Sequence, residues 1–240
     1  MKAPARKSEW NRWWLVVSYA AAMAWVESAV VFYLRSMMDR IEPYQPNPLP
    51  AIGGFARVEL PREMATLIML FAVGMLAGRT WRARFGYALI AFGVWDIFYY
   101  VFLKVICGWP NTLLDWDVLF LLPLPWWGPV LAPILISLLM ILWGTLTSQF
   151  KLHRTPVLAK WRVWALNLLG VGLALYVFMA DTLAVSRHGL EAIRIMLPEN
   201  FNWTLFCVAL LLMAMPVLKL LWEGVAQREP IMVDTNSQEN

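Results

Sequence analysis

Histidine, cysteine and charged residues are scarce in this chain of 240 residues. It contains two histidines and two cysteines, and only 15% of its residues are charged. A haem held by two histidines, a zinc site of the HExxH type and a cysteine-rich metal cluster all need ligands that this sequence lacks. His153 and His188 fall in predicted connections, so we expect no Ser-His-Asp or Cys-His catalytic arrangement within a span. We therefore predict no metal site and no cofactor.

The net charge of +4 is not a sign of nucleic-acid binding. Lysine and arginine are concentrated in particular loops, where the rule for membrane orientation accounts for them. The sequence contains no nucleotide-binding motif either. We predict no nucleic-acid partner, and active transport by this chain would need a proton, an ion gradient or a partner ATPase.

Hydrophobic residues make up 60% of the chain, and its mean hydropathy is +0.58. Several uncharged runs reach or approach the roughly 20 residues that a helix needs to cross a bilayer. The sequence therefore predicts an all-α fold: a polytopic bundle in which the lipid bilayer surrounds about six transmembrane helices. Because the first apolar run has about 22 residues, we interpret it as a span and not as a signal peptide. The predicted spans are residues 13–34, 63–78, 85–107, 129–147, 161–181 and 203–222.

The basic residues predict the orientation of these spans. Of the 20 lysines and arginines, 13 fall on the side of the N-terminus and seven on the other side. We expect both termini to be cytoplasmic and the protein to lie in a bacterial inner (plasma) membrane. The predicted organisation is a cytoplasmic segment 1–12, a single membrane domain 13–222, and a disordered cytoplasmic tail 223–240.

Two connections on the outer side have distinctive compositions. Residues 35–62 contain five prolines and two glycines, which disfavour a regular helix and predict an extended segment. That segment would be either a lid or an ordinary surface loop. In residues 189–197, apolar side chains recur at helical spacing beside Glu191 and Arg194, which predicts a short amphipathic helix in the outer interface.

Prolines also mark the stretch before the fourth span. Residues 118–122 are too few to cross the membrane, and Pro123 and Pro125 should end this apolar segment. We predict a short Pro-rich re-entrant or interfacial turn here. Irregular backbone at membrane depth persists only where protein or a water-filled cavity surrounds it, so this turn favours a site nearby.

Two carboxyl groups fall within predicted spans, Glu27 in the first and Asp96 in the third. An acidic side chain at the bilayer centre costs roughly 2.5 to 3.5 kcal/mol, so neither should face lipid. Tyr99 and Tyr100 lie one turn beyond Asp96 and could donate to it, and Arg35 could reach back to Glu27. The alternative is that each carboxyl makes only a structural hydrogen bond or ion pair between helices.

Further carboxyl groups lie nearer the outer surface. Glu63 is placed in the first turn of the second span, where a negative charge complements the helix dipole, and Asp117 could cap the short apolar segment. The pair Asp115 and Asp117 also has the spacing of carboxylates that hold Mg²⁺ against a lipid diphosphate. Metal-assisted lipid chemistry is thus a minor alternative, and the absence of a second DxxxD-like motif on another span argues against prenyl-transfer machinery.

Small residues predict where helices approach closely. Gly74 and Gly78 form a GxxxG pattern, Gly170 and Ala174 repeat its spacing, and a small-residue stripe in the first span ends at Ser28. Because Ser28 follows Glu27, this stripe favours Glu27 facing a neighbouring helix. Cys107 and Cys207 are expected to be free thiols.

These features predict one polar pocket that opens to the outer side and contains acidic and aromatic residues. Its function would be solute binding or transport, as in a permease, with a small solute, a proton or a cation as ligand. One alternative is an intramembrane enzyme that uses carboxylate acid/base chemistry on a lipid or isoprenoid, and another is a scaffold or assembly subunit among other membrane subunits. No catalytic residue is assigned. The pocket candidates are Glu27, Asp96, Tyr99, Tyr100, Asp117, Arg35 and Glu63.

Overall fold

The computed structural model describes residues 5–46, 52–120, 124–149 and 161–226. Six of the helices in this part of the chain are long and apolar enough to cross a membrane, which confirms the predicted multi-pass helical bundle. The last helix continues to Ala226, so the first four residues of the predicted tail 223–240 are helical, and residues 227–240 lie outside the described residues. The helices are α1 (Ala5–Met37), α2 (Ile52–Ala77), α3 (Trp81–Cys107), α4 (Leu131–Gln149), α5 (Trp161–Val185), α6 (Leu190–Ile195) and α7 (Trp203–Ala226), and the strands are β1 (Trp116–Val118) and β2 (Trp127–Pro129).

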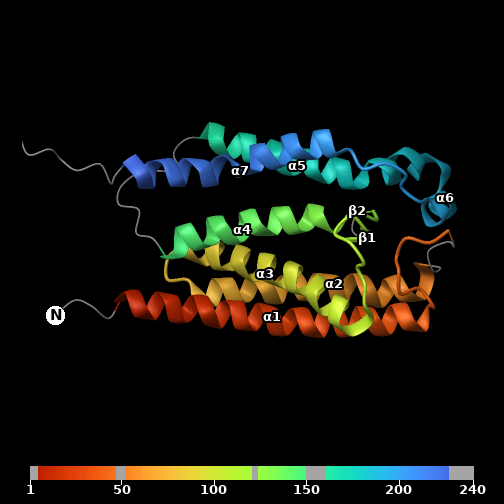
Figure 1. Cartoon of the computed structure of the whole chain (residues 1–240), viewed down its shortest axis with the longest axis horizontal. Coiled ribbons are helices and arrows are strands. Elements are labelled where there is room, and N and C mark those ends of the chain that lie inside the picture. Colours follow the sequence, from red (N-terminus) through yellow and green to blue (C-terminus); the bar gives the residue numbers. More distant parts are fainter. Residues whose placement is uncertain (1–4, 47–51, 121–123, 150–160, 227–240) are drawn as a thin grey trace, which may run out of the picture.

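The long helices form a group of four and a separate pair. Helix α3 packs on α1, α2 and α4, α5 packs on α7, and α4 connects the two parts through α7 (Figure 1). The start of α1 and the end of α7 lie at the same end of the bundle. We call this the inner end and the opposite end the outer end, following the predicted orientation, which stays a prediction.

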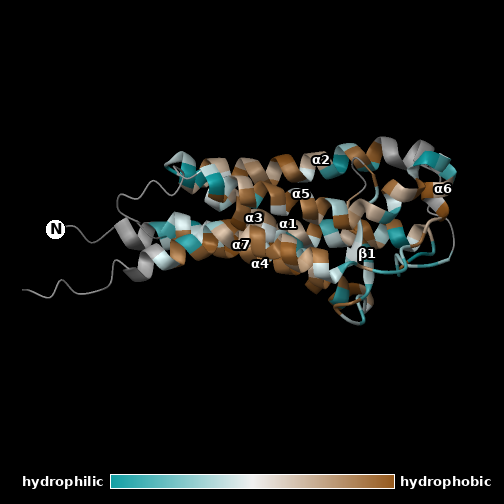
Figure 2. Cartoon of the chain, turned by 90° about the horizontal axis from the view of Figure 1, so that it is seen from above, coloured by the Kyte–Doolittle hydropathy of each residue, from teal (hydrophilic) through white to brown (hydrophobic). Residues whose placement is uncertain are grey.

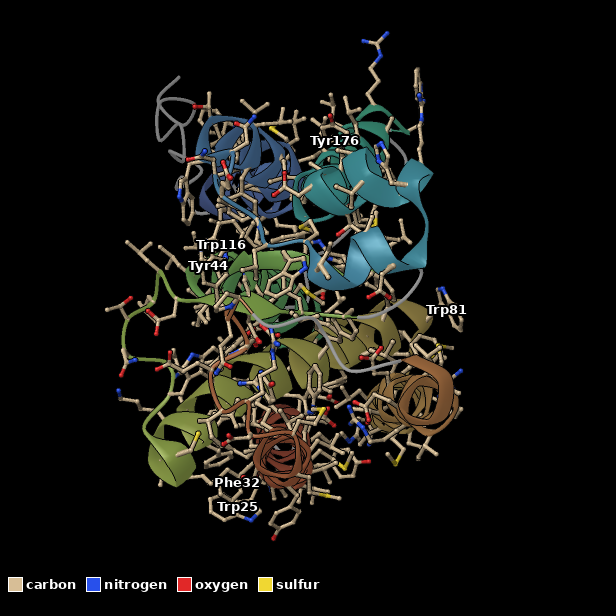
Figure 3. The ribbon with its side chains drawn as sticks, turned by 90° about the vertical axis from the view of Figure 1, so that its right-hand side faces the viewer. Trp25, Phe32, Tyr44, Trp81, Trp116 and Tyr176 are labelled. Atoms are coloured by element: carbon tan, nitrogen blue, oxygen red, sulfur yellow. The ribbon has the colours of Figure 1, made fainter. Side chains whose placement is uncertain are left out.

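The outside of the bundle is apolar over most of its length. Leu15, Leu76 and Val105 expose 70%, 86% and 71% of their surface, and Trp25 and Tyr176 point away from the bundle (Figure 3). Figure 2 shows hydrophobic residues along the middle of the helices and hydrophilic residues toward both ends. Exposed apolar side chains over this length suit contact with lipid tails and would be unfavourable in water.

Close helix packing occurs at the predicted small residues. A Cβ atom added at Gly74 would collide with the backbone of Ala88, so α2 and α3 touch through their main chains. A Cβ at Gly170 would lie 2.7 Å from the Ala209 carbonyl oxygen on α7. Ser28 is fully buried and its hydroxyl donates to the Tyr99 carbonyl at 3.0 Å. These contacts confirm the interpretation of the small residues as packing sites.

The prediction that residues 35–62 form an extended segment was wrong at both ends. Helix α1 continues to Met37, and α2 begins at Ile52 with Pro61 inside it. Glu63 therefore lies well within α2 and not in its first turn. Proline removes one helical hydrogen bond, but Arg62 pairs with Glu59 on the preceding turn and with α1, and these contacts stabilise the helix on both sides of Pro61.

The Pro-rich stretch before α4 is built around an antiparallel hairpin that the sequence analysis did not foresee. Strands β1 and β2 pair with Trp116 opposite Pro129 and Val118 opposite Trp127. The Thr182 hydroxyl of α5 donates to the Pro125 carbonyl at 2.8 Å, and all three residues of β2 are buried. Strand β2 is thus enclosed by protein, as expected for irregular backbone next to membrane spans.

Two further local predictions agree with the structure. Helix α6 forms within the segment that was expected to be a short amphipathic helix. Cys107 and Cys207 are both free thiols.

Candidate functional site

A cavity of about 830 Å³ lies between the group α1–α4 and the pair α5–α7. It is lined by six of the seven predicted pocket residues: Glu27, Arg35, Glu63, Asp96, Tyr99 and Tyr100. Asp117 does not line it but is bonded to Arg35, which does. Arg40, Glu59, Thr66 and Ser137 also line the cavity, and these residues were not among the predicted candidates.

Glu27 is held by α2. Its carboxylate accepts from Arg62 Nη1 at 2.5 Å and from the Thr66 hydroxyl at 3.3 Å. Arg62 also pairs with Glu59, through Nε at 2.9 Å and Nη2 at 2.5 Å. The expected pair between Glu27 and Arg35 is therefore wrong, because Glu27 faces α2 and the outer extension of that helix brings Arg62 to it.

Arg35 pairs instead with Asp117 at the hairpin. Its Nη2 lies 2.8 Å from Asp117 Oδ1 and 3.3 Å from the Tyr99 hydroxyl, and its guanidinium carbon is 4.5 Å from the ring centre of Trp109. Asp117 is fully buried, and its Oδ1 also accepts from the Val118 N–H at 2.8 Å. Asp117 Oδ2 has no hydrogen-bond donor among the residues that the structure describes. Asp117 thus tethers the hairpin to α1 and is not the cap that we predicted.

Burial shifts the pKa values of two ionisable groups that lie outside the spans, Asp117 and Arg40. Burial raises the pKa of Asp117, while the charge of Arg35, the hydrogen bonds from Val118 and Arg35 and the proximity of the Tyr100 hydroxyl act in the opposite direction. Burial also lowers the pKa of Arg40, and repulsion from Arg35 lowers it further. Arg40 donates to the carbonyl oxygens of Pro43 and Gln45, at 2.8 Å and 3.2 Å from its Nη2.

Asp96 takes its hydrogen bond from α4 and not from a tyrosine. The Ser137 hydroxyl donates to Asp96 Oδ2 at 2.8 Å. A Cβ at Gly93 would lie 2.7 Å from the Ser137 carbonyl oxygen, so Gly93 allows the close approach of α3 and α4 that brings Ser137 within reach. Tyr99 lies one turn further toward the outer end, where its hydroxyl accepts from Arg35. The signal that sequence reasoning missed was Ser137, the one hydroxyl-bearing residue between Leu131 and Gly144 of the fourth span.

The cavity lining contains similar numbers of basic and acidic residues, whereas the sequence predicted an acidic pocket. Its lining includes three arginines (Arg35, Arg40 and Arg62) and four carboxyl groups (Glu27, Glu59, Glu63 and Asp96). Two of these four carboxyl groups, Glu27 and Glu59, pair with Arg62, and Arg35 pairs with Asp117 beside the cavity.

Asp115 and Asp117 do not act as a pair. Asp115 accepts from the Asn111 N–H and from the Thr112 hydroxyl, both at 2.7 Å, whereas Asp117 is bonded to Arg35. Within the described ranges, no three His, Cys, Asp or Glu side chains come together as metal ligands. The spacing of the two aspartates therefore reflects the local turn and hairpin.

The part of the cavity toward the inner end is mainly apolar. Phe85 and Leu89 of α3, Trp143 of α4 and Trp164 of α5 line it, and the amide of Asn167 on α5 donates to the Met213 carbonyl at 2.9 Å. The rings of Trp143 and Trp164 meet edge to face, with their centres 6.0 Å apart. The cavity thus joins a polar part at the outer end to an apolar part near the inner end.

No protein-family model matches this chain, and no curated protein or solved structure shows significant similarity to it.

Proposed function

We propose that this multi-pass membrane protein binds a ligand in the cavity and is a membrane-embedded binding protein or carrier. The observation that supports this best is the combination of space and polarity: buried and half-buried ionisable residues from three helices line a volume of about 830 Å³. Pockets of about 300 to 1,000 Å³ commonly hold small molecules. Ionisable groups are costly within a membrane and are usually retained for a ligand, an ion or a proton.

A purely structural role explains this arrangement less well. A pair such as Glu27 and Arg62 would join α1 to α2 equally well if apolar side chains filled the space beside it. Here the same groups line an open volume, together with Thr66, Tyr99 and Asp96. The hydrogen-bonding groups around this volume come from α1, α2, α3, α4 and α5, as expected for a site that contacts a ligand from several sides.

One observation favours intramembrane acid chemistry on a lipid or isoprenoid as a second candidate. Asp96 lines the cavity where the polar part meets the apolar part, and its hydrogen-bond partner is the neutral hydroxyl of Ser137. No lysine or arginine forms a salt bridge with it in the described part of the chain. A carboxyl group beside an apolar volume can deliver a proton to an apolar substrate.

The proposed location is a bacterial plasma membrane with both termini cytoplasmic, so that the polar part of the cavity faces outward. Labelling of single cysteines in intact cells tests this access. In a chain with Cys107 and Cys207 replaced by alanine, we expect an impermeant thiol reagent added outside to modify Thr66→Cys. Ala20→Cys is the control, because Ala20 is fully buried on α1 and does not line the cavity.

Native mass spectrometry of the protein purified from its membrane tests binding. We expect a bound molecule on the wild type that is lost from Glu27→Gln and kept by Glu9→Gln, since Glu9 pairs with Arg12 away from the cavity. An unreactive Thr66→Cys, together with no bound molecule on the wild type, would refute the proposal.

A further inference from the structure

The two parts of the cavity separate polar from apolar groups along the membrane normal. Toward the outer end lie Glu59, Arg62 and Glu27, and toward the inner end lie Leu89, Trp143 and Trp164. Asp96 and Ser137 mark the boundary between them. A ligand that fills the whole volume needs a polar group at one end and an apolar body at the other.

The cavity also extends to the lipid-facing side of the bundle. Helices α2 and α5 line it from opposite sides, but α2 packs on α3 and α1 while α5 packs on α7. Seen from the outer end, α2 and α5 lie apart (Figure 3). Leu168 on α5 and Phe85 on α3 line the cavity while exposing 66% and 39% of their surface. Because both residues lie in membrane spans, an apolar chain can reach the cavity from the bilayer without crossing water.

Glu27 is the carboxylate best placed to take part in binding. Arg62 is held by two carboxylates, Glu27 and Glu59, with N–O distances of 2.5 Å to each. If Glu27 turns to a ligand, Arg62 keeps Glu59 on its own helix. Because the group that can turn to the ligand is a carboxylate, a head group with only negative charge would be repelled by it. A head group with a cationic nitrogen would be attracted to Glu27, and an attached phosphate could still accept from Arg62.

We propose that the cavity binds a membrane amphiphile, with its apolar chain between Leu89, Trp143 and Trp164 and its nitrogen-bearing cationic or zwitterionic head group at Glu27 and Arg62. This inference rests on the proposed function and names its ligand class. The head group points to the outer end and the chain toward the inner end, which is the direction of a lipid in the outer leaflet. An amphiphile that enters from the outer leaflet between α2 and α5 therefore keeps its orientation in the membrane when it binds.

Photo-crosslinking with lipid probes tests the proposal. The full-length protein is placed in nanodiscs of phosphatidylglycerol, which lacks nitrogen, and receives lysophosphatidylethanolamine carrying a diazirine near the chain end. Lysophosphatidylglycerol with the same chain is the comparison. We expect the ethanolamine probe to label Leu89 and Trp143 severalfold more than the glycerol probe does. Both probes should label the lipid-facing residues Leu15 and Val105 equally.

Two variants on α5 separate the cavity from the lipid-facing surface. Val171 lines the cavity, so Val171→Trp should fill it and lower cavity labelling severalfold. Leu169 is 54% exposed and does not line the cavity, so Leu169→Trp should leave that labelling unchanged. Glu27→Gln should remove the preference for the ethanolamine probe.

The outcomes distinguish this inference from the proposed function. Labelling confined to lipid-facing residues, with Thr66→Cys still accessible from outside, would overturn the amphiphile and leave a site for a water-soluble ligand. Equal cavity labelling by the two probes would overturn the assignment of the head group. Absence of cavity labelling, of Thr66→Cys modification and of a bound molecule would refute both proposals.

Discussion

Replacement of Asp117 by alanine leaves the Arg35 guanidinium buried without its carboxylate. The two groups are 2.8 Å apart, and their side chains expose only 1% and 10% of their surface. The other contacts of Arg35 are weaker, since the Tyr99 hydroxyl and the Ile41 carbonyl lie 3.3 Å and 3.4 Å from its nitrogens. Removing one partner of a buried pair typically costs about 3 to 5 kcal/mol, and we expect Asp117→Ala to lower the free energy of unfolding by that amount.

The destabilisation by Asp117→Ala arises because the Arg35 guanidinium is left buried without a carboxylate. The double variant Arg35→Met, Asp117→Ala removes both charges, so it should be markedly more stable than Asp117→Ala alone, because replacing a buried pair by apolar groups is often neutral. Arg12→Ala provides a matched control: Arg12 and Glu9 are 3.1 Å apart but expose 23% and 28% of their side chains. Its expected cost is about 0 to 1 kcal/mol.

Equilibrium unfolding in mixed micelles of dodecyl sulfate and a mild detergent, followed by tryptophan fluorescence, measures these differences. Two results would refute the reasoning. One is an Asp117→Ala cost as small as that of Arg12→Ala. The other is a double variant whose cost equals the sum of the two single costs, because additivity means that the groups do not interact.

Three further predictions concern titration and helix packing. Because burial raises the pKa of Asp117, the stability of wild type relative to Asp117→Asn should be greatest below about pH 4 and should fall as pH rises through the raised pKa; unfolding across this range tests the sign. Gly74→Ala should cost about 1 to 3 kcal/mol through collision with α3, whereas Gly172→Ala, whose added Cβ meets nothing within 4 Å, should be neutral or stabilising; a similar cost for both would contradict this. Ser137→Ala should cost about 1 to 3 kcal/mol by removing the donor to Asp96, and a Ser137→Thr variant as unstable as the alanine variant would show that the hydroxyl is not the cause.

The sequence predicted the spans and the inward direction of the acidic residues because both depend on transfer from water to lipid. Long apolar runs can be read without knowing which helices are neighbours, and the same cost excludes Glu27 and Asp96 from the lipid face. Both residues are indeed buried, at 8% and 7% exposure. Whether the cavity that they line binds a ligand stays a prediction.

The hydrogen-bond and salt-bridge partners of Glu27 and Asp96 could not be predicted from the sequence in the same way. A carboxylate on one span has several donors within reach, and the choice depends on the relative height and rotation of two helices. Glu27 takes Arg62 because α2 begins far outside its predicted start, and Asp96 takes Ser137 because Gly93 lets α4 approach. Arg40 was missed because the carbonyl oxygens of its own loop, which no sequence pattern identifies as acceptors, receive its hydrogen bonds.

The salt bridges in and beside the cavity differ in whether the carboxylate can leave its arginine for a ligand without leaving a buried charge unpaired. Asp117 is the carboxylate that pairs with Arg35, and it also ties the hairpin to α1, so neither group can turn to a ligand without leaving a buried charge. Arg62 has a second carboxylate in Glu59, held on the preceding turn of the same helix. Glu27 can therefore exchange Arg62 for a ligand while the guanidinium stays paired. This asymmetry gives Arg35 and Asp117 a structural role and makes Glu27 the residue whose substitution should change binding more than folding.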